Sequence, residues 1–143
     1  MRYVLDQVKD KEPGTEYLAI YDTETISNQK HILSPPGISY VKAIDYDSSY
    51  LTIHNHASCD TFSVEDMIQL YDHKHCKAIY VVGNNGNCYS LIKTEKYDGT
   101  GLFSAIMQRR LGYEPYKSFE LEDFIKECEN YGIKYSERTY RNT

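Results

Sequence analysis

The sequence has no tryptophan and only four cysteines, and it lacks any long run of apolar residues. The cysteines are widely spaced and include no Cys-x-x-Cys pair, so we predict neither a zinc site built on cysteine nor a disulfide framework. No apolar run approaches the roughly 20 residues of a membrane-spanning helix. The N-terminal stretch MRYVLDQVKDKEPG lacks the apolar core of a secretory signal. These absences predict a protein of a reducing, cytoplasmic compartment.

A surplus of basic residues is also missing, since the formal net charge is −5. Proteins that bind nucleic acid draw much of their affinity from basic side chains that neutralise phosphates. The short basic patches, Arg109-Arg110 and Arg138 to Arg141, are expected to be solvated surface. We therefore expect neither nucleic acid nor a membrane to be the main partner.

Tyrosine is the abundant aromatic residue, with 15 in the chain. Its ring packs while its hydroxyl stays polar, which suits a sheet-rich core and contact surfaces. A chain of 143 residues is predicted to form a single domain with one core. We divide it into an N-terminal arm (1–14), a core that carries the motifs described below (15–93) and a C-terminal helical extension (94–143).

Apolar patterning and turn residues predict an α/β fold in which helices pack on a mixed sheet. We expect strands at residues 17–21, 30–33, 50–54, 78–83, 87–93 and 133–135. We expect helices at residues 63–73, 102–111 and 118–131. Residues 38–46 fit either a strand or a short helix. Asn84-Asn85-Gly86 predicts a tight hairpin turn, because Asn-Gly tolerates the positive φ that such a turn needs.

The stretch Leu51 to Asp66, LTIHNHASCDTFSVED, carries the chemistry. His54 and His56 are two apart at the end of an apolar run, and residues two apart on a strand share a face. Ser63 and Asp66 follow across a polar loop, where Ser63 is a favoured helix N-cap. Two imidazoles and one carboxylate form a plausible site for a divalent metal of the zinc type, with a fourth position open for water. Such a metal lowers the pKa of water to about 7, and the reaction also needs a general base.

The order of these residues resembles the motif of the JAMM (MPN+) metalloproteases. That motif is a glutamate, then His-x-His-Pro, a spacer and Ser-x-x-Asp. Here Glu16, His54-Asn55-His56, Ser63 and Asp66 occupy the corresponding places. The likeness is closest to RadC-like and phage-type members and extends from Glu16 to about Leu91.

The resemblance implies a zinc ion (Zn2+) bound by His54, His56 and Asp66, with Glu16 as the base that holds the water. It implies that Ser63 helps to stabilise the tetrahedral oxyanion. The fold implied is a three-layer sandwich with a mixed sheet flanked by helices, of the JAMM or cytidine-deaminase-like kind. The function implied is cleavage of a peptide or isopeptide bond in a bacterial or phage-infected cell. The substrate would be a protein or peptide, such as a ubiquitin-like modifier or a phage or host protein.

Two positions depart from the motif, and they leave a second function open. Ala57 stands where the family usually has proline, and the spacer from His56 to Asp66 is one residue shorter than in the commonest form. The alternative is a non-catalytic JAMM-like interaction or assembly domain of a phage or mobile-element protein, such as one for head morphogenesis. A nuclease or DNA-repair association is a third possibility, which the acidic charge disfavours.

Several residue assignments also have alternatives. Glu12 and Glu24 are other candidates for the base. Ser63 and Asp66 could be only a helix cap and a first-turn acid. The group His73, His75 and Cys76 could be a second metal cluster, but we interpret it as a helix end. Cys59 and Asp60 could line a substrate path beside the metal.

Overall fold

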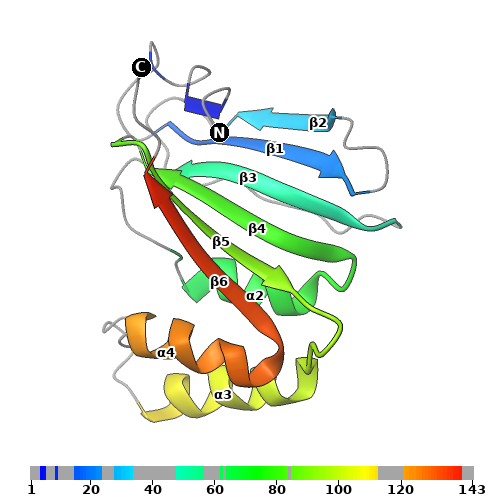
Figure 1. Cartoon of the computed structure of the whole chain (residues 1–143), viewed down its shortest axis with the longest axis vertical. Coiled ribbons are helices and arrows are strands. Elements are labelled where there is room, and N and C mark those ends of the chain that lie inside the picture. The colour runs from blue at the N-terminus through cyan, green and yellow to red at the C-terminus, as the bar shows by residue number, and fades with distance from the viewer. Residues whose placement is uncertain are drawn as a thin grey trace.

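The fold is described by a computed structural model of the chain, which contains one sheet and several helices (Figure 1). The model describes residues 4–5, 9, 15–23, 28–33, 48–56, 62, 64–83, 85–112 and 121–139. The predicted α/β class with a mixed sheet is confirmed. The segment 38–46 and most of the N-terminal arm lie outside the described residues.

Six strands form the sheet, in the order β2-β1-β3-β4-β5-β6. Their bounds are β1 Tyr17–Asp22, β2 Asn28–Leu33, β3 Tyr50–His56, β4 Cys76–Gly83, β5 Asn87–Lys93 and β6 Ile133–Thr139. Only β3 and β4 run parallel, and every other neighbouring pair is antiparallel. All six strands were predicted. Five of them, all except β5, are longer than expected by one to four residues. For example, β3 continues two residues past its predicted end at His54, and β6 continues past Tyr135 to Thr139.

The helices are α2 (Val64–Asp72), α3 (Gly99–Gly112) and α4 (Leu121–Glu127), and α4 continues as the 3-10 helix η1 (Cys128–Tyr131). The helix predicted at 102–111 begins three residues early because Asp98 caps it. The Asp98 Oδ1 atom accepts a hydrogen bond from the Gly101 N–H at 3.0 Å. The helix predicted to end at residue 131 changes to 3-10 geometry at Cys128. It ends at Gly132, which has a positive φ of 73°.

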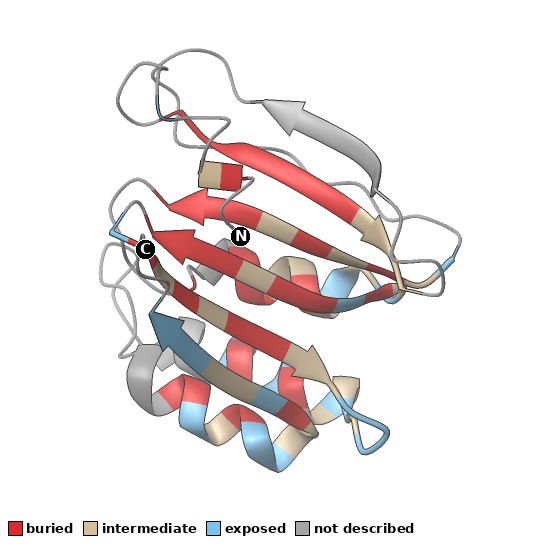
Figure 2. Cartoon of the chain, turned by 45° about the horizontal axis from the view of Figure 1, so that its top comes forward, coloured by how far each residue is buried: buried red, intermediate tan, exposed pale blue. Residues whose placement is uncertain are grey.

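The helices α2, α3 and α4 lie on one side of the sheet, and their apolar faces share one core with it (Figure 1). Strand alternation places Leu18, Ile20, Ile79, Val81 and Leu91 on that face. A smaller cluster on the other face comprises Val4, Tyr17, Ala19 and Val82. Figure 2 shows that burial is greatest along the inner strands and declines toward β6, whose last residues are exposed.

The C-terminal segment belongs to the same core as the rest of the chain. Leu102, Ile106 and Phe124 from α3 and α4 join the larger cluster, and β6 pairs with β5 along seven residues. Within the described residues, no helix is long and apolar enough to cross a membrane.

The turn at Gly132 gives a test of this packing. A Cβ at Gly132 would meet the backbone carbonyl of Lys96, and the positive φ adds strain for any other residue. We expect Gly132→Ala to lower the free energy of unfolding by at least about 2 kcal/mol, measured by urea denaturation. The matched control is Gly99→Ala, where the nearest atom is the Tyr97 hydroxyl at 3.3 Å. Equal stability of the two variants would contradict the tight turn.

Candidate metal centre

The site forms where the parallel pair β3 and β4 is joined through α2. In this β-α-β unit the carboxyl end of β3 leads to the amino end of α2, a place where α/β folds commonly bind ligands. His54 and His56 are among the last three residues of β3, and their side chains share the face of the sheet that α2 covers. Asp66 is the third residue of α2, so it lies in the first helical turn.

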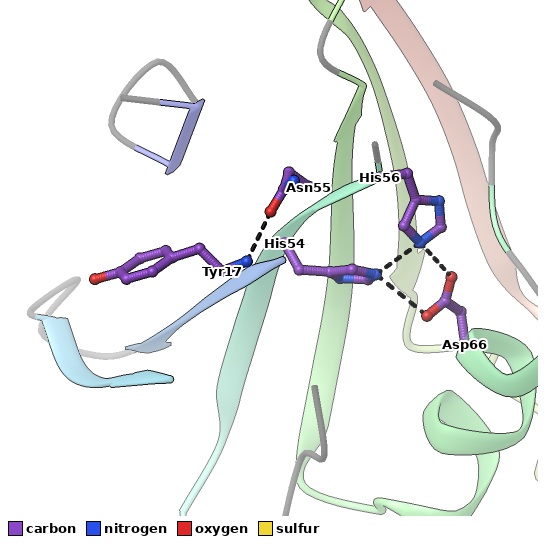
Figure 3. A network of polar contacts seen from close by, with 5 residues as sticks. All are labelled: Tyr17, His54, Asn55, His56 and Asp66. Carbon is purple, nitrogen blue, oxygen red and sulfur yellow. Dashed lines mark hydrogen bonds and ion pairs between the residues drawn. The ribbon is translucent and has the colours of Figure 1, made fainter. Parts of the chain in front are cut away.

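The side chains of His54, His56 and Asp66 converge on one point (Figure 3). The two imidazole Nε2 atoms are 3.0 Å apart. Asp66 Oδ1 lies 3.3 Å from His54 Nε2, and Asp66 Oδ2 lies 3.3 Å from His56 Nε2. The edge-to-face packing of the two rings, with centroids 4.8 Å apart, aims both nitrogens at the carboxylate.

Hydrogen bonds alone satisfy this arrangement poorly. An imidazole nitrogen carries either one proton or one lone pair, yet each Nε2 here contacts both the other Nε2 and a carboxylate oxygen. If His54 donates to His56, then His56 Nε2 has no proton for Asp66. A single cation at the centre would accept the lone pairs of both nitrogens and of the carboxylate together.

The spacing of the donor atoms also fits a metal of the zinc type. A tetrahedral zinc ion with bonds of about 2.0–2.1 Å holds its donor atoms about 3.3 Å apart. The observed separations of 3.0 and 3.3 Å are close to that value. Two imidazoles and one carboxylate leave one tetrahedral position for another ligand. Among the described residues, this is the only group of three or more histidine, cysteine or acidic side chains with such convergence.

The three residues of the centre are buried, and their environment changes the pKa of Asp66. His54, His56 and Asp66 are at most 9% exposed. Burial by itself would raise the pKa of the Asp66 carboxyl, but the charge and hydrogen bonds of His54 and His56 together outweigh it and hold that pKa far below its usual range. Asp66 is therefore a carboxylate at neutral pH, as a metal ligand must be.

Glu16 lies beside this centre, immediately before β1. The ladder between β1 and β3 pairs Leu18 with His54, so continuing the same register places Glu16 opposite His56 and on the same face. Glu16 is 8% exposed and interacts electrostatically with His54, His56 and Asp66. Burial raises the pKa of the Glu16 carboxyl, the two histidines oppose that shift, and Asp66 adds to it.

In the protonation state that can bind a metal, in which the imidazoles are neutral, the four side chains carry a charge that a dication would balance. When both carboxyls are ionised and both imidazoles are neutral, Glu16 and Asp66 contribute −1 each, for a formal charge of −2. Buried charge is costly unless it is paired or coordinated. A divalent ion would neutralise the site, and the residues present therefore fit such a metal.

Five other residues were singled out from the sequence as candidates for the site or its surroundings. Ser63, Cys59, Asp60, Glu12 and Glu24 lie outside the described residues.

The predicted helix end at His73, His75 and Cys76 forms no metal cluster within the described chain. The His73 ring lies 3.4 Å from the Tyr50 hydroxyl, and the Cys76 thiol donates to the Ala78 carbonyl. α2 ends at Asp72, one residue earlier than predicted.

In the sequence, Asn55 is distinguished only by its position between the two histidines of the motif. The structure makes it a fully buried residue whose side chain bonds to the segment around Glu16. Its position between two histidines on a strand predicts that it faces away from them. The partner segment, nearly forty residues away, contains Glu16 of the motif, but nothing in the sequence of Thr15 and Tyr17 predicts that they bond to Asn55.

No protein-family model, no curated protein and no solved structure matches this chain. The chemistry of the centre must therefore be inferred from its own residues.

Metal binding is the most direct test of the centre. We expect the purified chain to bind about one zinc ion, and zinc to raise the melting temperature because it binds the folded state. His54→Ala and Asp66→Ala each remove one donor and should abolish both effects. His75→Ala removes a histidine outside the group and serves as the control. Elemental analysis and thermal melts would contradict the site if the wild type bound no zinc and zinc left its melting unchanged.

The raised pKa of Glu16 predicts a pH-dependent cost to stability. Because the folded chain binds the Glu16 proton more tightly than the unfolded chain, whose pKa is near the ordinary 4.5, ionisation destabilises the fold at neutral pH. Metal-free Glu16→Gln should therefore unfold at higher denaturant than the wild type at pH 7. The difference should shrink as the pH falls through the folded-state pKa and should vanish below about 4, where the unfolded as well as the folded wild type becomes protonated.

The exposed Glu129→Gln substitution is the control for this measurement and should leave the midpoint unchanged. A wild type as stable as Glu16→Gln at pH 7 would show that the buried carboxylate carries no such cost.

Proposed function

We propose that the chain is a zinc-dependent peptidase or isopeptidase of the JAMM type, as its motif suggests. The observation that supports this most is the convergence of His54, His56 and Asp66 with Glu16 buried beside them. Three protein ligands and an adjacent buried acid are the components of a hydrolytic metal site, whereas a structural zinc site has four protein ligands.

When bound at the three ligands, a zinc-type metal supplies a Lewis acid and activates water at neutral pH. Glu16 then has two tasks that its environment suits. Its carboxylate oxygens accept the proton of the attacking water and return it to the leaving amine. A carboxyl whose pKa is raised by burial is a better proton acceptor than a solvated one, and it releases the proton more readily than a stronger base would.

The ligands have tasks of their own in this proposal. Asp66 stays ionised because of its two histidine neighbours, and its charge holds the imidazoles oriented toward the centre. The low exposure of all four side chains excludes bulk water, which strengthens each electrostatic interaction at the site. Ser63, through its place in the motif, is assigned to stabilise the oxyanion of the substrate carbonyl.

The proposal extends to the finer fold and to the substrate. The fold proposed is the three-layer sandwich of the JAMM or cytidine-deaminase-like kind. A mixed sheet whose parallel pair, β3 and β4, is joined through the helix that carries Asp66 supports it. The helices α2, α3 and α4 supply one of its helical layers, because all three pack on the same face of the sheet. The substrate is proposed to be a protein or peptide, such as a ubiquitin-like modifier or a phage or host protein.

A second candidate is a JAMM-like domain that binds a partner without catalysis. Ala57 in place of the motif proline favours it. The apolar side chains Phe103 and Met107 on α3 also favour it, because they are exposed and Phe103 stacks on Tyr71 with ring centroids 5.0 Å apart. Such a domain could keep its metal for stability, so metal content does not separate the two functions.

The decisive variant is Glu16→Gln. It keeps the three ligands, so zinc should still bind at the wild-type stoichiometry, while turnover should fall by roughly 10²–10⁴-fold because the base is lost. Suitable substrates are quenched-fluorescence peptide mixtures and ubiquitin-like conjugates, assayed with zinc-loaded protein. Glu129→Gln, at an exposed position, should retain full turnover. Zinc-loaded wild type that cleaves none of these substrates, or Glu16→Gln that cleaves as well as the wild type, would contradict the peptidase proposal.

A further inference from the structure

Asn55 occupies the centre of the histidine pair but belongs to a different interaction. Its side chain is fully buried, and Figure 3 shows it directed away from the two imidazoles toward Tyr17. It shares a face with Ile53, which packs against the smaller apolar cluster on the other side of the sheet. A buried side-chain amide is costly unless it is hydrogen-bonded, so the partners of Asn55 explain its position.

Both of its hydrogen bonds go to the backbone on either side of Glu16. Asn55 Oδ1 accepts from the Tyr17 N–H at 2.7 Å, and Asn55 Nδ2 donates to the Thr15 carbonyl at 3.1 Å. The orientation of the amide is unambiguous because a backbone N–H only donates and a carbonyl only accepts. Thr15 and Tyr17 are themselves buried.

These two bonds define the backbone conformation of Glu16. The Thr15 carbonyl belongs to the peptide group before the Glu16 Cα atom, and the Tyr17 N–H belongs to the peptide group after it. The rotation between those two peptide planes is set by φ and ψ of Glu16 alone. Holding both planes with one rigid amide therefore fixes the direction of the Glu16 Cα–Cβ bond.

The bonds also replace a piece of the sheet. The ladder between β1 and β3 ends at the pair Leu18 and His54, and the next residue of β1 is Tyr17. The Tyr17 N–H bonds to the side chain of Asn55 in β3, which accepts as the carbonyl of a peptide group would. The strand end that carries both imidazoles thus also holds the segment that carries the acid, at a separation set by one side chain.

We propose that Asn55 is a positioning residue, which clamps residues 15–17 so that the Glu16 carboxylate stands at the His54, His56 and Asp66 centre. This proposal rests on the proposed function, since it gives Glu16 the role of the base. Asn55 touches neither the metal ligands' donor atoms nor the reacting groups, and it acts through the backbone of Glu16.

The first test uses metal-free protein and no substrate. In Asn55→Ala the Tyr17 N–H loses its acceptor, so its amide hydrogen exchange, followed by NMR, should become about tenfold faster. The amide of Leu91 in β5, which is separated from β3 by β4, should exchange at the wild-type rate. Unchanged exchange at Tyr17 would overturn the clamp itself.

The second test separates positioning from stability in the zinc-loaded protein. Asn55→Ala should keep about one zinc and lose turnover on the order of 100-fold, the cost of a misplaced catalytic group. In the Glu16→Gln background it should cause no further loss, because the residue it positions is already disabled. Leu91→Ala, which destabilises the core through β5, should keep its turnover at temperatures where it is folded. An additive loss in the double variant, or turnover like that of Leu91→Ala, would overturn the proposal.

Asn55→Asp is a second variant that tests the proposal if Asn55→Ala does not fold. When ionised, its carboxylate keeps an acceptor for the Tyr17 N–H but offers no donor to the Thr15 carbonyl. Its turnover, measured at a pH where this carboxyl is ionised, should therefore lie between those of the wild type and Glu16→Gln. Wild-type turnover in Asn55→Asp together with wild-type exchange at Tyr17 in Asn55→Ala would again exclude the clamp.

Cobalt substitution separates failure of this inference from failure of the peptidase proposal. The visible absorption of bound Co2+ responds to groups at its open position. Glu16→Gln should change that spectrum, and Asn55→Ala should change it in the same way, whereas Leu91→Ala should not. If the wild type cleaves no substrate but these spectra behave as stated, the peptidase proposal fails and the clamp stands. If the wild type cleaves while Asn55→Ala keeps both turnover and spectrum, the clamp fails and the peptidase proposal stands.

Discussion

Four ionisable side chains are buried together at the end of β3, and the structure around them depends on how that burial is compensated. Each Nε2 of His54 and His56 lies within 3.3 Å of both the other Nε2 and the Asp66 carboxylate, a set of contacts that protons alone satisfy poorly. Glu16 adds a second acid at the same place. A low-dielectric site of this kind gains from a divalent cation far more than a solvated one would.

The fold brings the four groups together through two different connections. The β3–α2–β4 unit places the carboxyl end of a strand against the first turn of a helix, which joins the histidines to Asp66. The antiparallel pairing of β1 with β3 brings the start of β1 to the end of β3, which adds Glu16. Asn55 ties the second connection to the first by holding the backbone around Glu16. The candidate metal ligands and the proposed base therefore depend on one strand end, so a displacement of β3 would disturb both.

Much of this arrangement was predictable because it is local. Strand periodicity puts His54 and His56 on one face whatever the rest of the fold does, and the helix start fixes Asp66 within a turn. The α/β class followed from apolar patterning in the same way. The errors were local as well: β3 was ended two residues early, and the cap by Asp98 was missed, because element boundaries depend on contacts that periodicity does not contain.

The sequence by itself determined the ligand types, their spacing and their placement on one strand and one helix, since those follow from bond geometry over a few residues. Tertiary structure alone decided that Glu16 stands beside them, because that depends on how β1 pairs with a strand nearly forty residues away. It also decided the hydrogen bonds of Asn55. From its place between two histidines on a strand, the sequence predicts only that the Asn55 side chain points to the opposite face of the sheet. Its partners lie across a strand pair whose register is set by the core on both faces of the sheet. The motif thus predicts the kind of site, and the packing of the sheet determines whether the residues of the motif come together.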